Sequence, residues 1–217
     1  MKKILLAASI SCISLASLAQ VAGGLKAGYN LSSMGGNKEG RGNVRPRSGF
    51  HFGVGVHIPI HRVLSVQPEL LFSTGGANWD EIIELENSEL VKLEITQKLT
   101  YLSMPVSMVY SIGRFNIQAG PQMNLLLAAG DDVEMTRISG GNIITVSGFA
   151  RKSENLKKID AGLNFGAGLD FGNVGISAWY YLGLTNLHDA EGFPNESKIT
   201  NNVIQMSLMY TFSDQQM

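Results

Sequence analysis

Cysteine is nearly absent from this chain of 217 residues, and the single one, Cys12, lies close to the amino terminus. A disulfide framework, a cysteine nucleophile and a cysteine-ligated metal site are therefore excluded from the rest of the chain. Neither charge is in excess, because 17 Lys and Arg residues stand against 18 Asp and Glu residues. Nucleic acid is not an expected partner, since its binding proteins are strongly basic. After the first 19 residues no apolar run reaches about 18 residues, so no membrane-spanning helix is predicted.

The first residues have the composition of a secretory signal peptide. They contain two lysines, an apolar stretch and two small residues: Lys2, Lys3, residues 4–16, Ser17 and Ala19. We expect cleavage after Ala19, which makes residues 1–19 a signal peptide and residues 20–217 a single domain. A lipoprotein signal acylated at Cys12 is the alternative, but the three residues before this cysteine lack the leucine that such signals usually carry.

What the sequence does contain is apolar residues in strict alternation. In AGLNFGAGLDFG, residues 161–172, every odd-numbered position is apolar, while the even-numbered positions hold glycine, asparagine and aspartate. A period of two predicts a β-strand. The same alternation occurs in seven other segments, which brings the predicted strands to eight: 23–32, 49–58, 64–73, 101–110, 115–127, 174–184 and 203–212.

The connections between these strands alternate in length. Three are short, at residues 59–62, 111–114 and 172–173, and four are long and polar, at residues 33–48, 75–98, 129–158 and 185–202. Short connections are typical of tight hairpin turns. Short and long connections at opposite ends of a sheet predict an up-and-down meander in which all neighbours are antiparallel.

An apolar face opposite a face of small polar residues fits a membrane barrel, whose outer band is apolar and whose interior is polar. The lumen of an eight-stranded barrel is filled by side chains, so Gly162, Gly166 and Gly168 would make room for larger neighbours. Those neighbours would be Trp179, Tyr181 and Gln205. Seven aromatic residues near the strand ends would form interfacial girdles: Tyr29, Phe50, Phe72, Tyr110, Phe115, Phe171 and Phe212.

The predicted fold class is therefore all-β, an eight-stranded antiparallel up-and-down transmembrane β-barrel. Pro68 and Pro121 lie inside predicted strands, where each removes a ladder donor, so we expect local bulges at both. A soluble, secreted barrel that binds a small ligand is the competing interpretation, because such barrels have the opposite arrangement of faces.

Several segments also resemble a known family, the outer membrane β-barrel domain proteins of the Bacteroidota, many of them labelled PorT-like, which are small barrels of the OmpA and OmpX type. The resemblance is carried by GLKAGYNLS, GFHFGVGV, VQPELLFS, YLSMPVSM, GPQMNLLL, DAGLNFGAGLDF and a terminal MYTF. It covers the whole chain after the signal and implies fold and location. These motifs carry no chemistry, so the resemblance implies fold and location much more strongly than activity.

Catalytic, cofactor-binding and metal-binding residues are not predicted. His51 and His57 lie six residues apart on one strand, about 20 Å at a rise of 3.3 Å per residue, so they cannot share a metal even with Glu69 nearby. No serine with a histidine partner is evident, which argues against a hydrolase. The lumen is expected to hold a polar network in which buried charges pair; the charged members are Lys26, Glu69, Asp160 and Asp170.

The long loops differ in charge. Loop 33–48 is basic, loop 75–98 is acidic, and the two are neighbours, so we expect them to attract one another. The basic loop carries Lys38, Arg41, Arg45 and Arg47 beside Glu39. Residues 82–95 alternate weakly around Asn87 and Ser88 and predict a hairpin that extends the strands, as do residues around Gly140 and Gly141. Such hairpins fit either a solvated cap or a partner site that works by strand addition.

From these features we expect a small integral outer membrane barrel that is monomeric, does not conduct, uses no cofactor and has both termini in the periplasm. Its partners would be outer membrane lipid and, through loops 75–98 and 129–158, another protein. Its role would be structural or mediated by the loops. A lipid-modifying outer membrane enzyme and a soluble small-ligand-binding barrel are the alternatives.

Overall fold

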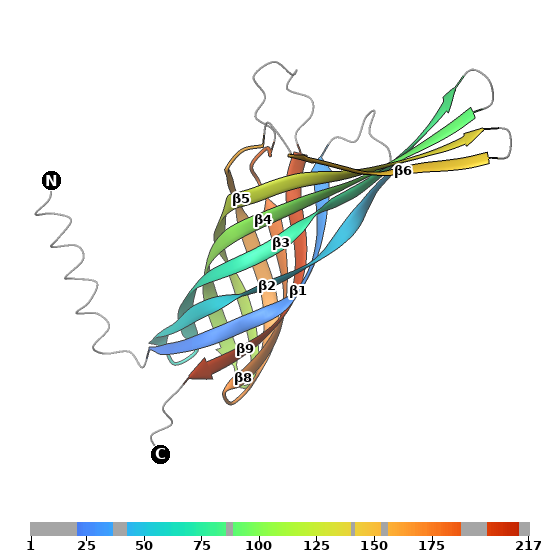
Figure 1. Ribbon diagram of the computed structural model, residues 1–217. Coiled ribbons are helices and arrows are strands. Elements are labelled where there is room, and N and C mark those ends of the chain that lie inside the picture. Colours follow the sequence, from blue (N-terminus) through green and yellow to red (C-terminus); the bar gives the residue numbers. More distant parts are fainter. Residues whose placement is uncertain are drawn as a thin grey trace, which may run out of the picture.

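The computed structural model describes residues 21–36, 43–85, 89–139, 142–152, 156–187 and 199–212. These residues form nine strands, eight of which close into a barrel (Figure 1). The strands are β1 (Ala22–Gly36), β2 (Asn43–His61), β3 (Leu64–Leu85), β4 (Glu89–Ile112), β5 (Phe115–Ser139), β6 (Asn142–Lys152), β7 (Ile159–Phe171), β8 (Val174–Gly183) and β9 (Ile199–Phe212). In the described part of the chain, no helix is long and apolar enough to cross a membrane. The expected signal peptide and its cleavage point lie outside the described residues.

The barrel is an up-and-down meander, as the alternating connections predict. The pairing order is β4-β3-β2-β1-β9-β8-β7-β5, and a β4–β5 pairing closes the ring. Every neighbouring pair is antiparallel. The predicted fold class is thus confirmed, and the chain's first and last strands meet at a seam between β1 and β9.

Three short turns mark one end of the barrel, called here the turn end. They consist of Arg62–Val63, Gly113–Arg114 and Gly172–Asn173. Gly113 and Gly172 have φ angles of 63° and 68°, a left-handed conformation that glycine adopts without steric cost. Strand β1 begins and β9 ends at this same end, where Gly23 pairs with Phe212.

Side chains alternate between the two faces of the barrel wall, as the period of two predicts. On β7, Leu163 and Phe165 are 39% and 44% exposed, whereas Asn164 between them is 1% exposed. Aromatic residues on the outer face also cluster, with the rings of Phe52 and Phe72 centred 5.3 Å apart. The apolar outer face and polar inner face are those of a membrane barrel.

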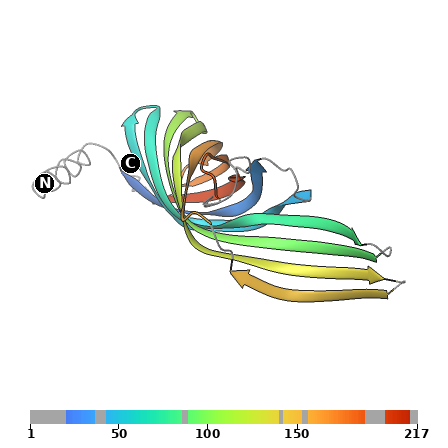
Figure 2. The same ribbon diagram turned by 90° about the horizontal axis from the view of Figure 1, so that it is seen from above.

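Three strands are much longer than a membrane requires. β3, β4 and β5 have 22, 24 and 25 residues, whereas about 10 residues span a bilayer. Their far ends leave the wall together with β6 and project to one side of the ring (Figures 1 and 2). This extension, residues 78–85, 89–98, 129–139 and 142–152, is called the paddle, and it marks the paddle end of the barrel.

The paddle confirms the two predicted hairpins and adds one feature to them. Residues of β3 and β4 pair as far as Leu85 with Glu89, and those of β5 and β6 pair as far as Ser139 with Asn142. The β4–β5 pairing also continues into the paddle, up to Leu90 with Ile138. The hairpins therefore form one four-stranded sheet in the order β3-β4-β5-β6.

The bulges expected at two prolines are not observed. Pro68 pairs with Val106, and Pro121 pairs with Leu163, without a change of register in either ladder. Each proline removes one donor, and the ladders tolerate that loss without an inserted residue. The register shifts lie elsewhere, for example between Thr100 and Tyr101 on β4.

Candidate functional site: a filled lumen and a projecting sheet

Glycines on the inner face make room for large side chains of neighbouring strands. A Cβ atom at Gly166 would lie 2.9 Å from Cδ2 of Trp179, and one at Gly162 would lie 2.8 Å from Cε2 of Tyr181. Trp179 and Tyr181 are 5% and 1% exposed. The prediction that glycine acts as a spacer is confirmed at these two positions, and the rings fill the lumen beside them.

An ion pair in the lumen links β1 to β3 across β2. The Nζ atom of Lys26 lies 2.8 Å from Oε2 and 3.0 Å from Oε1 of Glu69, and both side chains are buried. The same ammonium lies 4.2 Å from the centre of the Trp179 ring, close enough for a cation–π contact. This pairing of Lys26 with Glu69 confirms part of the predicted charge network.

The other two charged residues behave differently from the prediction. Asp160 is 0% exposed, and its Oδ2 accepts hydrogen bonds from Asn124 at 3.2 Å and Asn201 at 3.5 Å. Asp170 accepts one from Asn116 at 2.7 Å. Neither forms an ion pair with a described residue, so among the four charged residues of the predicted network the expected charge pairing is observed for Lys26 and Glu69 alone. Amide donors thus take the place of a cation at Oδ2 of Asp160, while its Oδ1 has no hydrogen-bond partner among the described residues. Asp170 is exposed, so its charge is not a buried one.

A histidine with a serine partner, which the sequence did not reveal, lies in the lumen. The amide nitrogen of Asn30 donates to the carbonyl oxygens of Phe50 and Thr74, so its Oδ1 atom points to His51. Oδ1 lies 2.7 Å from Nδ1 of His51, which must then be the protonated nitrogen. Nε2 is left to accept the Ser207 hydroxyl, 2.9 Å away. The order Ser–His–Asn matches that of a nucleophile, its base and an orienting group.

The same histidine also has a structural role. Its ring passes over Gly28, where a Cβ atom would lie 2.6 Å from Cε1 of His51. His51 and Ser207 are 1% and 7% exposed. The contact joins β2 to β9 across β1, and so it fastens the seam of the barrel. Sequence spacing could not have found this pair, because the two residues are 156 positions apart.

Apolar side chains fill the mouth of the lumen at the paddle end. Leu99, Leu187 and Ala77 are 1%, 2% and 0% exposed and belong to one cluster of buried residues with Met34, Tyr101 and Ile199. We call this cluster the mouth cluster. The interior is therefore layered, with apolar packing at the paddle end and polar networks below it.

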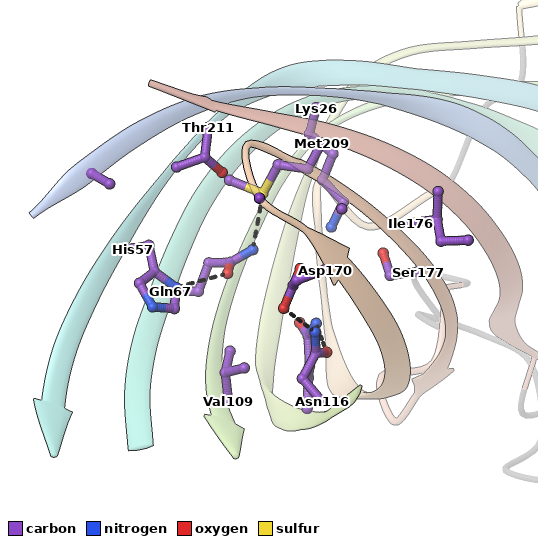
Figure 3. Close-up of a pocket in the computed structure, with 14 residues that line it drawn as sticks. Lys26, His57, Gln67, Val109, Asn116, Asp170, Ile176, Ser177, Met209 and Thr211 are labelled. Atoms are coloured by element: carbon purple, nitrogen blue, oxygen red, sulfur yellow. Dashed lines mark hydrogen bonds between the residues drawn. The ribbon is translucent and has the colours of Figure 1, made fainter. Parts of the chain in front are cut away.

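A polar cavity of about 290 Å³ opens at the turn end (Figure 3). Its lining includes Lys26, His57, Gln67, Asn116, Gln118 and Asp170. His57 thus faces the cavity, while His51 is not part of its lining and is buried in the lumen. In the described part of the chain, no group of three or more His, Cys, Asp and Glu side chains could hold a metal ion.

The paddle has two unlike faces. Residues that pair across its strands share a face, and Leu93, Met135 and Val146 form one such row. Met135 and Val146 are 43% and 46% exposed, and Ile144 on the same strand is 59% exposed. Trp79 on this face packs against the mouth cluster. The apolar face of the paddle is therefore continuous with the closed mouth of the barrel.

The opposite face is polar and carries ion pairs. Lys92 lies 2.6 Å from Glu94, and the acidic hydrogen-bond partner raises the pKa of Lys92. Arg45 of β2 lies 2.5 Å from Asp80 and 3.8 Å from Glu94. The predicted attraction between the basic and acidic loops is confirmed for Arg45. Lys38, Glu39 and Arg41 lie outside the described residues.

Strand β6 is an open edge of the paddle. Its described pairings run to β5 on one side. The main-chain groups on its other side are available to another strand, as edge groups generally are. Apolar side chains and an open edge thus occur together at Ile144 and Val146.

Comparisons with known proteins give matches at low identity to solved structures and one match to a family model. Ail, the attachment invasion locus protein of Yersinia pestis, is 14% identical with a TM-score of 0.40, and the match covers 89% of this chain and 99% of Ail. Neisserial surface protein A is 10% identical with a TM-score of 0.43 over 88% of this chain and 97% of that protein. No curated protein sequence matches the chain. A family model described as outer membrane protein beta-barrel domain matches residues 15–189. Since this match covers more than half of the chain, the protein belongs to the outer membrane β-barrel domain family.

Proposed function

We propose that this outer membrane barrel does not conduct and that its function lies in the paddle, which binds another protein. The observation that carries the proposal is the apolar paddle face that ends at the open edge of β6. Barrel and paddle then have separate tasks: the barrel anchors the protein in lipid, and the paddle presents a binding surface.

Support for a closed lumen comes from both of its layers. The mouth cluster places buried side chains such as Leu99 and Leu187 across one end. Below it, Tyr181, Trp179, Gln118 and Gln122 are all more than nine-tenths buried. An eight-stranded barrel has little interior beyond what side chains fill. Planar-bilayer recording of purified protein should show no steady single-channel current, and a reproducible current would contradict the closed lumen.

Support for a partner comes from the two features that strand addition requires. An edge strand offers main-chain hydrogen bonds, and side-chain contacts on one face provide selectivity. On β6 the exposed Ile144 and Val146 lie on the apolar face, while Thr145 lies on the polar one. The partner would therefore be an extended segment with apolar residues at alternate positions.

Site-specific crosslinking tests this part of the proposal. A photoreactive amino acid at Val146 should capture the partner in intact cells, whereas one at Met206, which is exposed on the barrel's outer face, should not capture it. Replacing residues 82–92 with an Asn-Gly turn shortens the β3–β4 hairpin and serves as a second comparison. Equal capture from both sites, or no specific product from Val146, would overturn the assignment to the paddle.

The orientation we propose places the turn end and both termini in the periplasm and the paddle outside the cell. It rests on the short turns and long outer loops typical of such barrels. We also propose that the chain is one of the Bacteroidota members of this family, on the basis of the sequence motifs given under Sequence analysis. Thr145→Cys should react with an impermeant maleimide in intact cells, and Asn173→Cys should react only after the outer membrane is opened. Reversed labelling would invert the orientation.

The Ser207–His51–Asn30 arrangement favours a second candidate function, acyl transfer or hydrolysis. The 2.9 Å contact between Ser207 and His51 has the geometry of an activated nucleophile. Both side chains are nearly fully buried, which favours the structural role instead. A fluorophosphonate probe that labelled Ser207 but not Ser177, or lipid A whose mass changed with expression, would support the enzyme.

A further inference from the structure

The polar cavity at the turn end is bordered by two hydrogen-bond relays that begin on carboxylates. We infer that this cavity binds a small organic cation that carries several N–H donors, such as an alkylammonium or guanidinium group. The inference concerns the barrel and is independent of the function proposed for the paddle.

The first relay runs from Asp170 into the lumen. Oδ2 of Asp170 accepts a hydrogen bond of 2.7 Å from the amide nitrogen of Asn116, and the carbonyl oxygen of Asn116 accepts one of 2.6 Å from Nε2 of Gln118. The carboxylate can only accept, so it fixes the direction of both amides. The relay therefore ends on a carbonyl oxygen, Oε1 of Gln118.

That last oxygen has no hydrogen-bond partner. Gln118 is 8% exposed, and its Oε1 is a buried atom without a partner among the described residues. Gln118 also lines the cavity. A buried acceptor left unpaired costs about 1–3 kcal/mol, so a donor delivered through the cavity would remove this cost. The orphan acceptor is the observation that points to a ligand.

The second relay reaches the cavity from the opposite wall. Oε1 of Glu69 accepts a hydrogen bond of 2.6 Å from Nε2 of Gln67, and this fixes Oε1 of Gln67 as the acceptor for Nδ1 of His57, 3.5 Å away. In a neutral imidazole Nδ1 is then the donor, and Nε2 remains an acceptor. Both relays thus begin on a carboxylate and end on a side chain that lines the same cavity, Gln118 in the first and His57 in the second. Figure 3 shows His57 and Gln67 of the second relay and Asn116 and Asp170 of the first.

Charge around the cavity has the matching sign. Glu69 is neutralised by Lys26 at 2.8 Å, but Asp170, exposed at the rim, has no ion pair with a described residue. Asp170 is therefore a carboxylate of the lining without a cationic partner among the described residues. A volume of about 290 Å³ lies near the lower limit of small-molecule pockets. The volume limits the ligand to a small molecule, and the carboxylate of Asp170 and the direction of both relays favour a cation over an anion.

A parallel relay elsewhere provides a matched control. Nε2 of Gln122 donates to Asn124 at 2.9 Å, and Asn124 donates to Asp160 at 3.2 Å. This relay joins the same two strands, β5 and β7, but Gln122 does not line the turn-end cavity. Gln118→Met and Gln122→Met therefore remove the same group from equivalent relays, and only the first change affects the cavity.

The test is a titration of the full folded protein in detergent micelles, followed by NMR chemical shifts. The probes are 1,4-diaminobutane and guanidinium, with tetramethylammonium as a cation that lacks N–H donors. We expect saturable shifts with the first two. Gln118→Met and Asp170→Asn should each weaken binding roughly tenfold or more, the effect of losing a charged hydrogen bond, while Gln122→Met should leave it unchanged.

Three results would overturn the inference. They are equal binding of tetramethylammonium, equal loss in Gln118→Met and Gln122→Met, and no saturable shift with either N–H probe. Each variant must retain the gel mobility of the folded barrel before boiling. If Gln118→Met fails this check, Asp170→Asn decides the outcome, because its side chain lies exposed at the rim and is replaced by one of the same shape.

Discussion

The ammonium of Lys26 and the carboxylate of Glu69 lie 2.8 Å apart, although strand β2 separates the strands that carry them. The contact is possible because β2 presents glycine at this level, where a Cβ atom at Gly55 would lie 3.2 Å from Cγ of Glu69. The barrel is thus held together by an ion pair across its lumen as well as by the hydrogen bonds between neighbouring strands.

Removing one partner of this ion pair should destabilise the barrel more than removing both. Lys26→Met leaves Glu69 as an uncompensated buried charge, which costs about 3–5 kcal/mol in other proteins. The double variant with Glu69→Leu should recover much of that loss. Urea unfolding in lipid vesicles, followed by gel mobility, measures the difference. A double variant as unstable as the single one would show that the pair itself is needed.

Arginine on the outer face should lower the stability of the barrel by an amount that depends on the depth of the residue in the membrane. Leu163→Arg places a charge on a strand centre and should cost about 2–4 kcal/mol, whereas the cost near an interface is about 0–1 kcal/mol. Ile60→Arg, beside the turn end and 62% exposed, is the matched control. Equal stability of the two variants in vesicles would contradict the lipid-facing assignment of Leu163.

A single methyl group should distinguish two glycines of β1. A Cβ atom at Gly28 would lie 2.0 Å from the carbonyl oxygen of Met206 and 2.6 Å from His51, whereas one at Gly23 would meet nothing within 4 Å. Gly28→Ala should therefore cost about 1–3 kcal/mol through overpacking, and Gly23→Ala should be nearly neutral. Equilibrium unfolding of both variants measures this, and similar values would rule out the close approach of His51 to β1.

The barrel should fold without the end of its paddle. Replacing residues 82–92 with an Asn-Gly turn removes the β3–β4 pairings beyond Glu81 with Leu93 but leaves those of the wall, such as Thr74 with Thr100. The variant should retain different gel mobilities before and after boiling. Loss of this difference in mobility would mean that the paddle contributes to barrel folding. A control variant in which residues 82–92 have a scrambled sequence of equal length would then show whether the length of the hairpin or its strand pairing is responsible.

Alternation of side chains predicted the fold because it depends on local geometry. Odd-numbered and even-numbered residues of β7 point to opposite faces of the wall, so Leu163 and Asn164 could be placed from the sequence alone. The Lys26–Glu69 pair could be anticipated, since opposite charges inside a lumen attract. The amide partners of Asp160 could not, because they depend on the register between β5, β7 and β9.

Long-range pairing explains the remaining differences. The union of the two hairpins into one paddle depends on β4 and β5 staying paired beyond the wall, for example at Leu93 with Met135, and the sequence does not state where pairing stops. The Ser207–His51 contact needs the seam to be known. Once β1 is placed between β2 and β9, the inward residues His51, Gly28 and Ser207 fall in one row.

The seam has a consequence for how the barrel is made. Gln205 of β9 donates to Oδ1 of Asn30 on β1, a contact between residues 175 positions apart. The chain loses entropy when a loop of this length closes, and the contacts that offset this loss form only after closure. A chain still missing its final strand would leave β1 and β8 as open edges, which lipid does not tolerate. Closure of the ring is therefore an all-or-nothing event that waits for the last strand to arrive.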